Sequence, residues 1–216
     1  MTLPVDLDIP TPIGTARAVL EGEPGRGRLV LGHGAGGGIE APDLRAARDA
    51  GRALGLQVVR VEQPWRVRGR RVAEAPPRLD TAWTAVVAAL PPVAGPLVLG
   101  GRSAGARVAC RTASVLGAAG VLALAFPLRP PGRPDRDRGD ELRPPQVPRL
   151  VVQGGRDAFG VPAPSDGVEV HVVAGADHGF AVRRLDGRTS AEVRQEVERV
   201  VGAWLAERLR AAQTLT

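Results

Sequence analysis

The residue types of a serine-based acyl-transfer centre occur in this chain in the order Ser103, Asp157 and His178. A serine hydroxyl is a weak nucleophile until an adjacent base takes its proton, and histidine is the base most often used. A carboxylate then orients the imidazole and stabilises its protonated form. Together the three residues would support attack on a carbonyl carbon, followed by hydrolysis of the acyl-enzyme.

The serine lies in a motif with a specific geometry. Gly101-Arg102-Ser103-Ala104-Gly105 matches the pattern G-x-S-x-G, which requires a sharp turn between a strand and a helix. The apolar residues before the motif and the helical spacing after it predict that context. The glycines allow close approach of the backbone, and the N–H of Ala104, at the helix N-terminus, can donate to a developing oxyanion.

Of the three histidines, His178 is the predicted base, because it follows the last predicted strand in a loop. His171 falls inside an alternating run and is expected to be a strand residue. For the acid, Asp157 follows the preceding strand and lies between the serine and the histidine in the chain. Asp166 and Asp177 are alternatives, although Asp177 is too close along the backbone to reach the back of the neighbouring ring easily.

A glycine-rich loop, residues 32–38, follows an early predicted strand. Backbone N–H groups can approach a substrate closely where side chains are missing. We predict that the second oxyanion donor is the N–H of Ala35 or of Gly34, and both alternatives stay open. His33 is then expected to be structural and to pin the loop.

Three side chains near these segments are candidates for substrate binding, namely Arg102, Trp65 and Arg68. Arginines of the loop 65–71 could bind an anionic group through bidentate hydrogen bonds. The alternative, which we favour, is a solvated loop in an arginine-biased protein. Trp65 fits a pocket wall and a core position equally well, and Cys110 fits a small buried hydrophobe.

The elements that must position these residues alternate along the chain. Short runs of strand length are separated by longer segments of helical spacing, a pattern typical of an α/β fold with a mainly parallel sheet. Because ligands bind at the carboxyl ends of such strands, the candidate segments should meet at one edge. The predicted strands cover residues 5–9, 16–20, 28–31, 57–61, 97–99, 121–126, 150–153 and 168–173. The predicted helices cover residues 42–54, 80–90 and 104–116, with a last helix starting near residue 189.

Length and composition narrow the function classes. The chain has 216 residues, and we expect one domain over residues 1–216, with a Pro- and Arg-rich excursion at residues 129–148 in place of a lid. A single cysteine excludes an intramolecular disulfide, and no Cys/His cluster suggests a metal site. No apolar run approaches the ~20 residues of a membrane span, and the N-terminus lacks the pattern of a signal peptide, so we expect a cytoplasmic protein.

The net charge of +6 could suggest binding to nucleic acids, but all 29 basic residues are Arg. With abundant Ala, Gly, Pro and Val, this composition is typical of coding bias in a GC-rich genome. Proteins that bind nucleic acids often stack bases on aromatic side chains, but this chain has no Tyr, three Phe and three Trp. We therefore expect no nucleic-acid partner. We also expect no membrane association, and a protein that is a monomer or a homodimer.

Five segments carry a family resemblance in the same order along the chain, and they span most of it: Leu31–Gly37, Gly101–Gly105, Phe126–Leu128, Gln153–Gly160 and Ala176–Phe180. They resemble α/β-hydrolases, in particular the small lidless proteins near the dienelactone hydrolases. Within that group the chain resembles the α/β-hydrolase-like family that includes a chromatin-complex subunit and a testis-expressed protein. The resemblance implies an α/β-hydrolase fold with a mostly parallel central sheet, helices on both faces and a minimal cap. The chain departs from dienelactone hydrolases in having Ser103 where those carry Cys.

The residues and the resemblance together predict a serine hydrolase that cleaves carboxylic ester or thioester bonds of a small-molecule substrate. The acyl-transfer mechanism that the resemblance implies needs no metal and no organic cofactor. The alternative is a non-catalytic binding module on the same scaffold, because a fold alone does not imply a function. The complete set of Ser103, Asp157 and His178 favours the enzyme.

Overall fold

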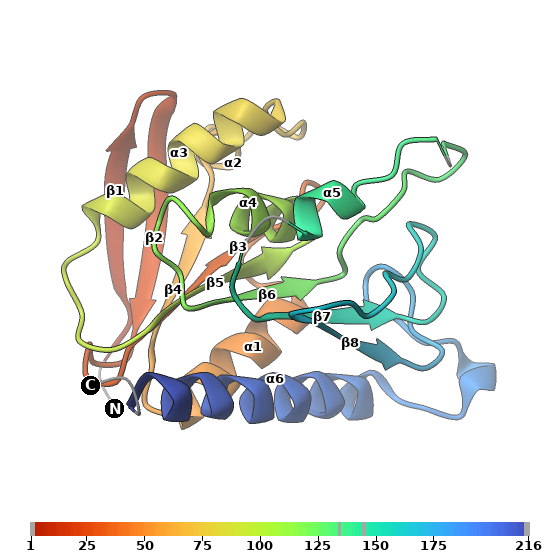
Figure 1. Cartoon of the computed structure of the whole chain (residues 1–216). Coiled ribbons are helices and arrows are strands. Elements are labelled where there is room, and N and C mark those ends of the chain that lie inside the picture. Colours follow the sequence, from red (N-terminus) through yellow and green to blue (C-terminus); the bar gives the residue numbers. More distant parts are fainter. Residues whose placement is uncertain (1–2, 134, 144–145, 214–216) are drawn as a thin grey trace.

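The computed structural model describes residues 3–133, 135–143 and 146–213. They form an eight-stranded sheet whose strand order is β1-β2-β4-β3-β5-β6-β7-β8 (Figure 1). β2 pairs antiparallel with both β1 and β4, and the remaining neighbours pair in parallel. The strands are β1 (Val5–Thr11), β2 (Gly14–Glu21), β3 (Arg28–Gly32), β4 (Gln57–Glu62), β5 (Leu97–Arg102), β6 (Gly120–Leu124), β7 (Arg149–Gly154) and β8 (Val168–Val173).

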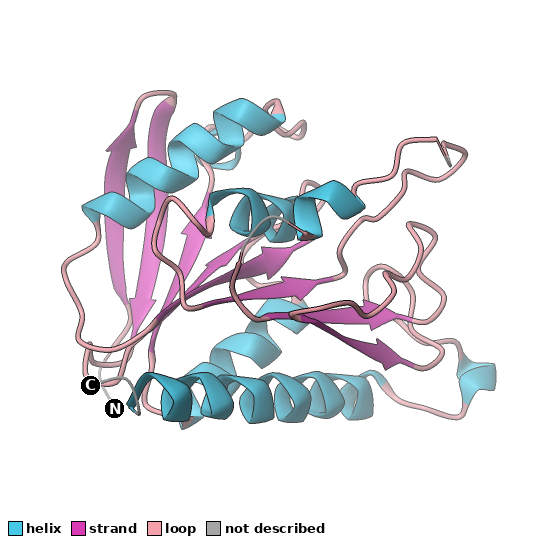
Figure 2. Ribbon diagram, in the orientation of Figure 1, coloured by secondary structure: helices cyan, strands magenta, loops and turns pink. Residues whose placement is uncertain are grey.

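Helices lie on both faces of the sheet, as Figure 2 shows. α1 and α6 pack together on one face, while α3 and α4 lie on the other with two short helices, α2 and α5 (Figure 1). This mostly parallel, two-sided arrangement confirms the fold class predicted from the sequence. The helices are α1 (Pro42–Ala53), α2 (Pro64–Val67), α3 (Pro76–Ala89), α4 (Ala104–Thr112), α5 (Gly139–Leu142) and α6 (Ser190–Gln213).

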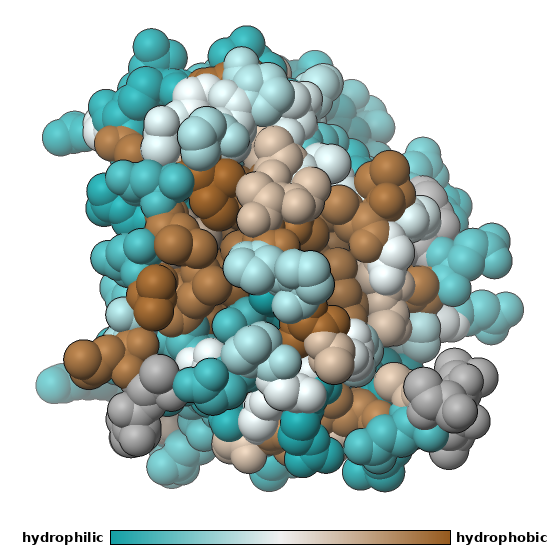
Figure 3. All heavy atoms as spheres, turned by 90° about the vertical axis from the view of Figure 1, so that its left-hand side faces the viewer, coloured by the Kyte–Doolittle hydropathy of each residue, from teal (hydrophilic) through white to brown (hydrophobic). Residues whose placement is uncertain are grey.

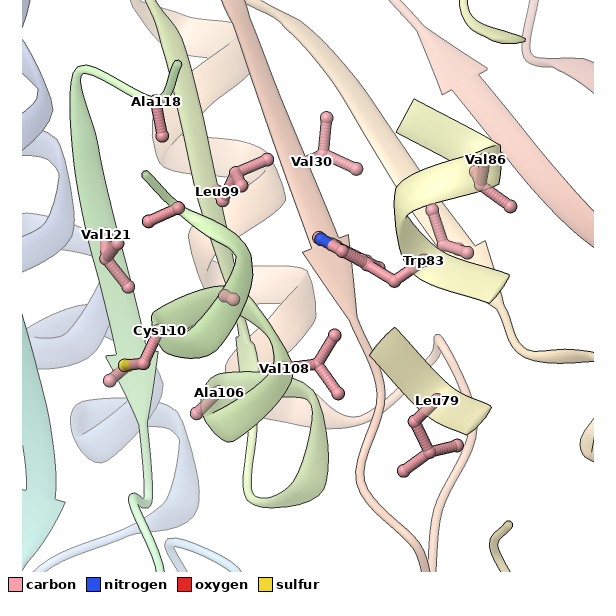
Figure 4. Close-up of a cluster of buried hydrophobic side chains, with 14 of the residues drawn as sticks. Val30, Leu79, Trp83, Val86, Leu99, Ala106, Val108, Cys110, Ala118 and Val121 are labelled. Atoms are coloured by element: carbon pink, nitrogen blue, oxygen red, sulfur yellow. The ribbon is translucent and has the colours of Figure 1, made fainter. Parts of the chain in front are cut away.

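Two apolar clusters fill the space between the sheet and the helices. β3, β6 and β7 are buried at every residue, because helices cover both sides of a parallel strand, and this explains their long apolar runs. The cluster on the α3–α4 side includes Trp83, Val108 and Cys110 (Figure 4). The cluster on the other side is closed by the apolar stripe of α6, formed by Val193, Val197, Val201, Trp204 and Leu205.

Several element boundaries differ from the predicted ones. α3 begins at Pro76, four residues before the predicted start. Proline is favoured at the first helical position, because an N–H there would have no acceptor within the helix. α2 forms one turn of helix that starts at Pro64 and runs into the segment 65–71, which was predicted as a loop. β5 continues to Arg102, and α4 ends at Thr112, earlier than predicted. The last helix starts as predicted, with Thr189 and Glu192 in a reciprocal capping box.

The segment 129–148, predicted to stand in place of a lid, contains one turn of helix, α5. Glu141 in this turn accepts hydrogen bonds from Arg107 and Arg111 of α4, which hold α5 against the body of the protein. Residues 134, 144 and 145 of the segment lie outside the described residues. Within the described part of the chain, no helix combines the length and the hydropathy needed to span a lipid bilayer.

β1 is an edge strand, and Figure 3 views the molecule from that side. Apolar side chains gather near the centre of this face (Figure 3). Val5 in β1 is exposed and Leu7 is half-buried. The candidate site residues Ser103, Asp157 and His178 lie elsewhere, just after the carboxyl ends of parallel strands.

Candidate active site

Ser103 stands on a strained turn between β5 and α4. Its backbone has φ 52° and ψ −109°, a conformation that a residue with a side chain rarely adopts. A Cβ atom placed on Gly101 or Gly105 would lie 2.5 Å or 2.3 Å from the carbonyl oxygen of Gly32. The two glycines of the motif are therefore needed because β3 passes directly beside the turn.

Ser103, His178 and Asp157 form an unbroken chain of hydrogen bonds. His178 Nδ1 lies 2.8 Å from Asp157 Oδ2, and His178 Nε2 lies 3.1 Å from Ser103 Oγ. An ionised carboxylate only accepts hydrogen bonds, so His178 Nδ1 carries the proton. Nε2 of the neutral ring is then the acceptor that faces the serine hydroxyl, which is the tautomer a general base requires.

Asp157 is held by donors that the sequence analysis did not identify. Its side chain is completely buried, and Gln153 Nε2 donates to Oδ2 over 2.7 Å while the Phe159 N–H donates to Oδ1 over 2.8 Å. Gln153 also donates to the carbonyl oxygens of Phe126 and Gly160. The signal was present in the sequence, because Gln153 is an uncharged polar residue directly after the apolar residues 150–152 of a buried strand.

The alternative acids lie in other environments. The Asp177 carboxylate accepts hydrogen bonds from the N–H groups of Gly179 and Ala181, so it shapes the turn that carries His178. Asp166 is exposed, in the turn before β8. His171 lies in β8, where Nε2 is 2.7 Å from Glu196 Oε1 of α6.

Phe159 is a further residue at the site that the sequence analysis missed. Its ring lies against the imidazole of His178, with centroids 4.5 Å apart and planes tilted by 39°. The Phe159 backbone binds Asp157 and its side chain covers the histidine, so one residue restrains two members of the hydrogen-bonded chain.

The glycine-rich loop packs against Ser103. A Cβ atom on Gly34 would lie 3.3 Å from Ser103 Cβ. His33 is buried, and its Nδ1 lies 2.8 Å from the Gly34 carbonyl while Nε2 accepts from the Gln63 N–H over 3.1 Å. Burial lowers the pKa of His33, and these two bonds require the neutral ring with its proton on Nδ1. His33 thus joins the loop to the end of β4.

The predicted oxyanion donors belong to α4, which directly follows Ser103, and to the glycine-rich loop, which contacts Ser103. Ala104 is the first residue of α4, where the helix leaves its N–H groups without intrahelical partners. Ala35 follows Gly34 in the glycine loop. Neither the Ala104 N–H nor the Ala35 N–H donates to a protein acceptor within the described residues. Both remain available to a bound oxygen atom.

Of the residues predicted to bind substrate, Trp65 lies in the interior of the protein and Arg68 is bonded to the β1–β2 hairpin. Trp65 is buried, lies 5.3 Å from the His33 ring between centroids, and lines a small cavity together with Ala104 and Gly105. Arg68 donates to the Ile13 carbonyl and to Glu74, which joins it to the β1–β2 hairpin.

Arg102, the third candidate binding residue, is engaged by the protein itself. Its Nε lies 3.1 Å from Asp43 Oδ2, and its Nη2 donates to the His178 carbonyl oxygen over 3.0 Å.

The single cysteine, Cys110, is buried in the core. Burial raises the pKa of Cys110 to about 12, so the thiol stays protonated inside the α4 core. In the described ranges no group of three or more His, Cys, Asp or Glu side chains could hold a metal ion.

A family model described as an alpha/beta hydrolase domain matches residues 25–206 of the chain. A search of curated protein sequences found no match to the chain. Among solved structures, the chain is similar to a serine hydrolase without a lid from Xanthomonas campestris, with a TM-score of 0.72 and 21% identity, covering 94% of this chain and 96% of that one. It is also similar to a dienelactone hydrolase from Anabaena variabilis, with a TM-score of 0.71 and 15% identity over 95% and 97% of the two chains. A third, Est1E from Butyrivibrio proteoclasticus with ferulic acid bound, gives a TM-score of 0.67 and 15% identity over 93% and 99%.

Proposed function

Because the chain belongs to the alpha/beta hydrolase domain family, we propose that it is a serine hydrolase that cleaves carboxylic ester or thioester bonds through an acyl-enzyme. The observation that carries the proposal is the hydrogen-bonded chain from Ser103 through His178 to the buried Asp157. The similar solved structures of a lidless serine hydrolase and a dienelactone hydrolase support the same general class.

In the first half of the proposed reaction, Ser103 Oγ attacks the carbonyl carbon while His178 Nε2 takes the hydroxyl proton. Asp157 stabilises the resulting imidazolium and keeps its ring in place. The N–H groups of Ala104 and of Ala35 or Gly34 donate to the oxyanion of the tetrahedral intermediate. The protonated His178 then gives its proton to the departing alcohol or thiol, and an ester of Ser103 remains.

In the second half, His178 Nε2 takes a proton from water, which attacks the acyl-enzyme carbonyl. The same N–H groups bind the second oxyanion, and the collapse of that intermediate returns the proton to Ser103 Oγ. The substrate therefore needs only a reactive acyl carbonyl and an alcohol or thiol leaving group. The ferulic acid bound to Est1E makes an aromatic acyl group one reasonable member of a substrate screen.

The first experiment is intact-mass measurement after treatment with a fluorophosphonate probe, because this reagent reports an activated serine without a known substrate. We expect one adduct on the wild-type protein and none on Ser103→Ala. The thermal unfolding temperature of the variant should match that of the wild type, since the hydroxyl is not part of the core. An unmodified, well-folded wild-type protein would contradict the proposal and favour the binding-module alternative.

Untreated wild-type protein and Ser103→Ala then go into a substrate screen. p-Nitrophenyl acetate, p-nitrophenyl butyrate, a short acyl thioester and a feruloyl ester together separate acyl size from the leaving group. Turnover of at least one of them by the wild type and not by Ser103→Ala is the expected result.

A further inference from the structure

The guanidinium of Arg102 connects three segments that build the site. Arg102 is the last residue of β5 and directly precedes Ser103. Its Nη2 donates to the backbone carbonyl of His178 over 3.0 Å, and its Nε pairs with Asp43 in the first turn of α1. The side chain is 15% exposed, so it is largely covered by these contacts.

Glycines make room for this guanidinium on both sides. A Cβ atom on Gly34, in the oxyanion loop, would lie 3.3 Å from Arg102 Nη1. One on Gly179, directly after His178, would lie 3.7 Å from Nη2. The guanidinium thus lies next to the loop that carries the predicted oxyanion donors and next to the loop that carries the predicted base.

Burying the Asp43 carboxylate is unfavourable unless a partner compensates it. Its carboxylate is 1% exposed, and among the described residues Arg102 is its ion-pair partner. Burial raises the pKa of Asp43, and the charge of Arg102 opposes that rise. Removing one partner of such a buried pair leaves the other uncompensated, so each residue depends on the other.

We propose that Arg102 and Asp43 are positioning residues for the reaction: Asp43 fixes the Arg102 guanidinium, which holds the His178 backbone and the glycine loop in register with Ser103. The proposal rests on the proposed serine-hydrolase function and adds two residues to it. It also assigns Arg102 to the support of the site, whereas its sequence position suggested contact with the substrate. Arginine suits this role because its planar guanidinium spreads the charge over several nitrogens, so that Nη2 can donate to the His178 carbonyl while Nε lies beside the Asp43 carboxylate.

The test compares Arg102→Met, Arg102→Lys and Asp43→Asn with the wild type. Arg111→Met is the matched control, because Arg111 is also on the β5–α4 unit, is 20% exposed and binds two carboxylates, Asp80 and Glu141, at the far end of α4. The readouts are the second-order rate constant for fluorophosphonate labelling, kcat and KM on any ester that is turned over, and the thermal unfolding temperature.

We expect labelling and kcat to fall by roughly 10- to 100-fold in all three variants, because a misplaced catalytic group costs rate even when it is still present. KM should change by less than about threefold, since neither residue is proposed to touch the substrate. The double variant Arg102→Met/Asp43→Asn should be no slower than Arg102→Met, because the two residues act as one unit. A raised KM with unchanged kcat, or labelling within twofold of the Arg111→Met control, would overturn the proposal.

A second readout does not depend on serine reactivity. The hydrogen-bonded Nδ1 proton of His178 can be followed by NMR, and the signal of His171, which lies in β8 against Glu196, serves as the internal reference. We expect Arg102→Met and Asp43→Asn to shift or broaden the His178 signal and to leave the His171 signal unchanged. If the wild type is not labelled, the proposed function fails, and an unchanged His178 signal in both variants would then overturn the positioning role separately. Should Arg102→Met fail to fold, Asp43→Asn and Arg102→Lys decide the outcome.

Discussion

Single buried polar residues explain most of the organisation of this site. Asp157 and Asp43 are both buried carboxylates, but they are stabilised in different ways. Asp157 accepts from Gln153, from the Phe159 backbone and from His178, whereas Asp43 relies on the charge of Arg102. The three donors fix the orientation of the Asp157 carboxylate, which is what its proposed role beside His178 requires.

At this scale we predict that Asp157→Asn lowers kcat by roughly 10⁴-fold while the protein stays folded. The amide can offer an N–H to His178 Nδ1, which would move the ring proton to Nε2 and abolish its role as acceptor for Ser103. The same change at the exposed Asp166, Asp166→Asn, is the control and should retain wild-type rates. Steady-state kinetics on a p-nitrophenyl ester measure both, and equal rates for the two variants would refute the assignment of the acid.

At the scale of elements, the β5–α4 turn depends on its contact with β3. Gly101 and Gly105 lie against the Gly32 carbonyl so closely that a methyl group would have to displace backbone atoms. The positive φ of Ser103 follows from this arrangement, because the chain must reverse within one residue before α4 begins. The backbone strain at Ser103 is thus maintained by packing between elements and not by the serine itself.

We therefore predict that Gly105→Ala lowers the free energy of unfolding by about 3 kcal/mol, since the contact is with rigid backbone. Gly202→Ala on α6 is the matched control, because a Cβ there meets only Ala50 Cβ at 3.8 Å. That change should raise the stability by about 0.5–1 kcal/mol through the helix propensity of alanine. Urea unfolding of the two variants measures both numbers, and a Gly105→Ala protein as stable as the wild type would contradict the account of the turn.

At the scale of the whole molecule, ion pairs connect elements that the sheet alone would leave apart. Glu141 in α5 accepts from Arg107 and Arg111 of α4, and Arg111 also binds Asp80 of α3. Burial of Glu141 opposes its ionisation, but the hydrogen bonds and charges of the two arginines prevail and lower its pKa below the ordinary value of 4.5. A lowered pKa of an acid means that folding favours the ionised form.

This network makes stability depend on pH in a defined direction. The contribution of Glu141 should be fully present above about pH 4.5 and lost as the pH falls through its lower folded-state pKa. Glu141→Gln should therefore cost about 1 kcal/mol at pH 7, and this cost should shrink as the pH falls below 4.5. Thermal unfolding as a function of pH tests this, with the exposed Glu169→Gln as control, and a constant difference between Glu141→Gln and the wild type would disprove it.

The sequence by itself determined the order of strands and helices and the residue types of the site. Periodicity and glycine-rich turns have a local physical cause, so they place Ser103 before a helix and His178 after a strand. The fold class predicted from these patterns is confirmed. The one turn of α2 and the early start of α3 were missed, because short helices that begin at proline give little periodic signal.

Only the tertiary structure decided which groups meet. Gln153 reaches Asp157, Phe159 covers His178, and Arg102 turns toward Asp43 and the His178 carbonyl. Asp43 lies 59 positions before Arg102 in the numbering of the chain, and nothing in its local sequence distinguishes it from a helix N-terminal aspartate. Such contacts depend on side-chain directions and on the register of neighbouring strands, which a single sequence does not encode locally. That is why the residues of the candidate site could be proposed from the sequence, while the side chains that support them became visible only in the fold.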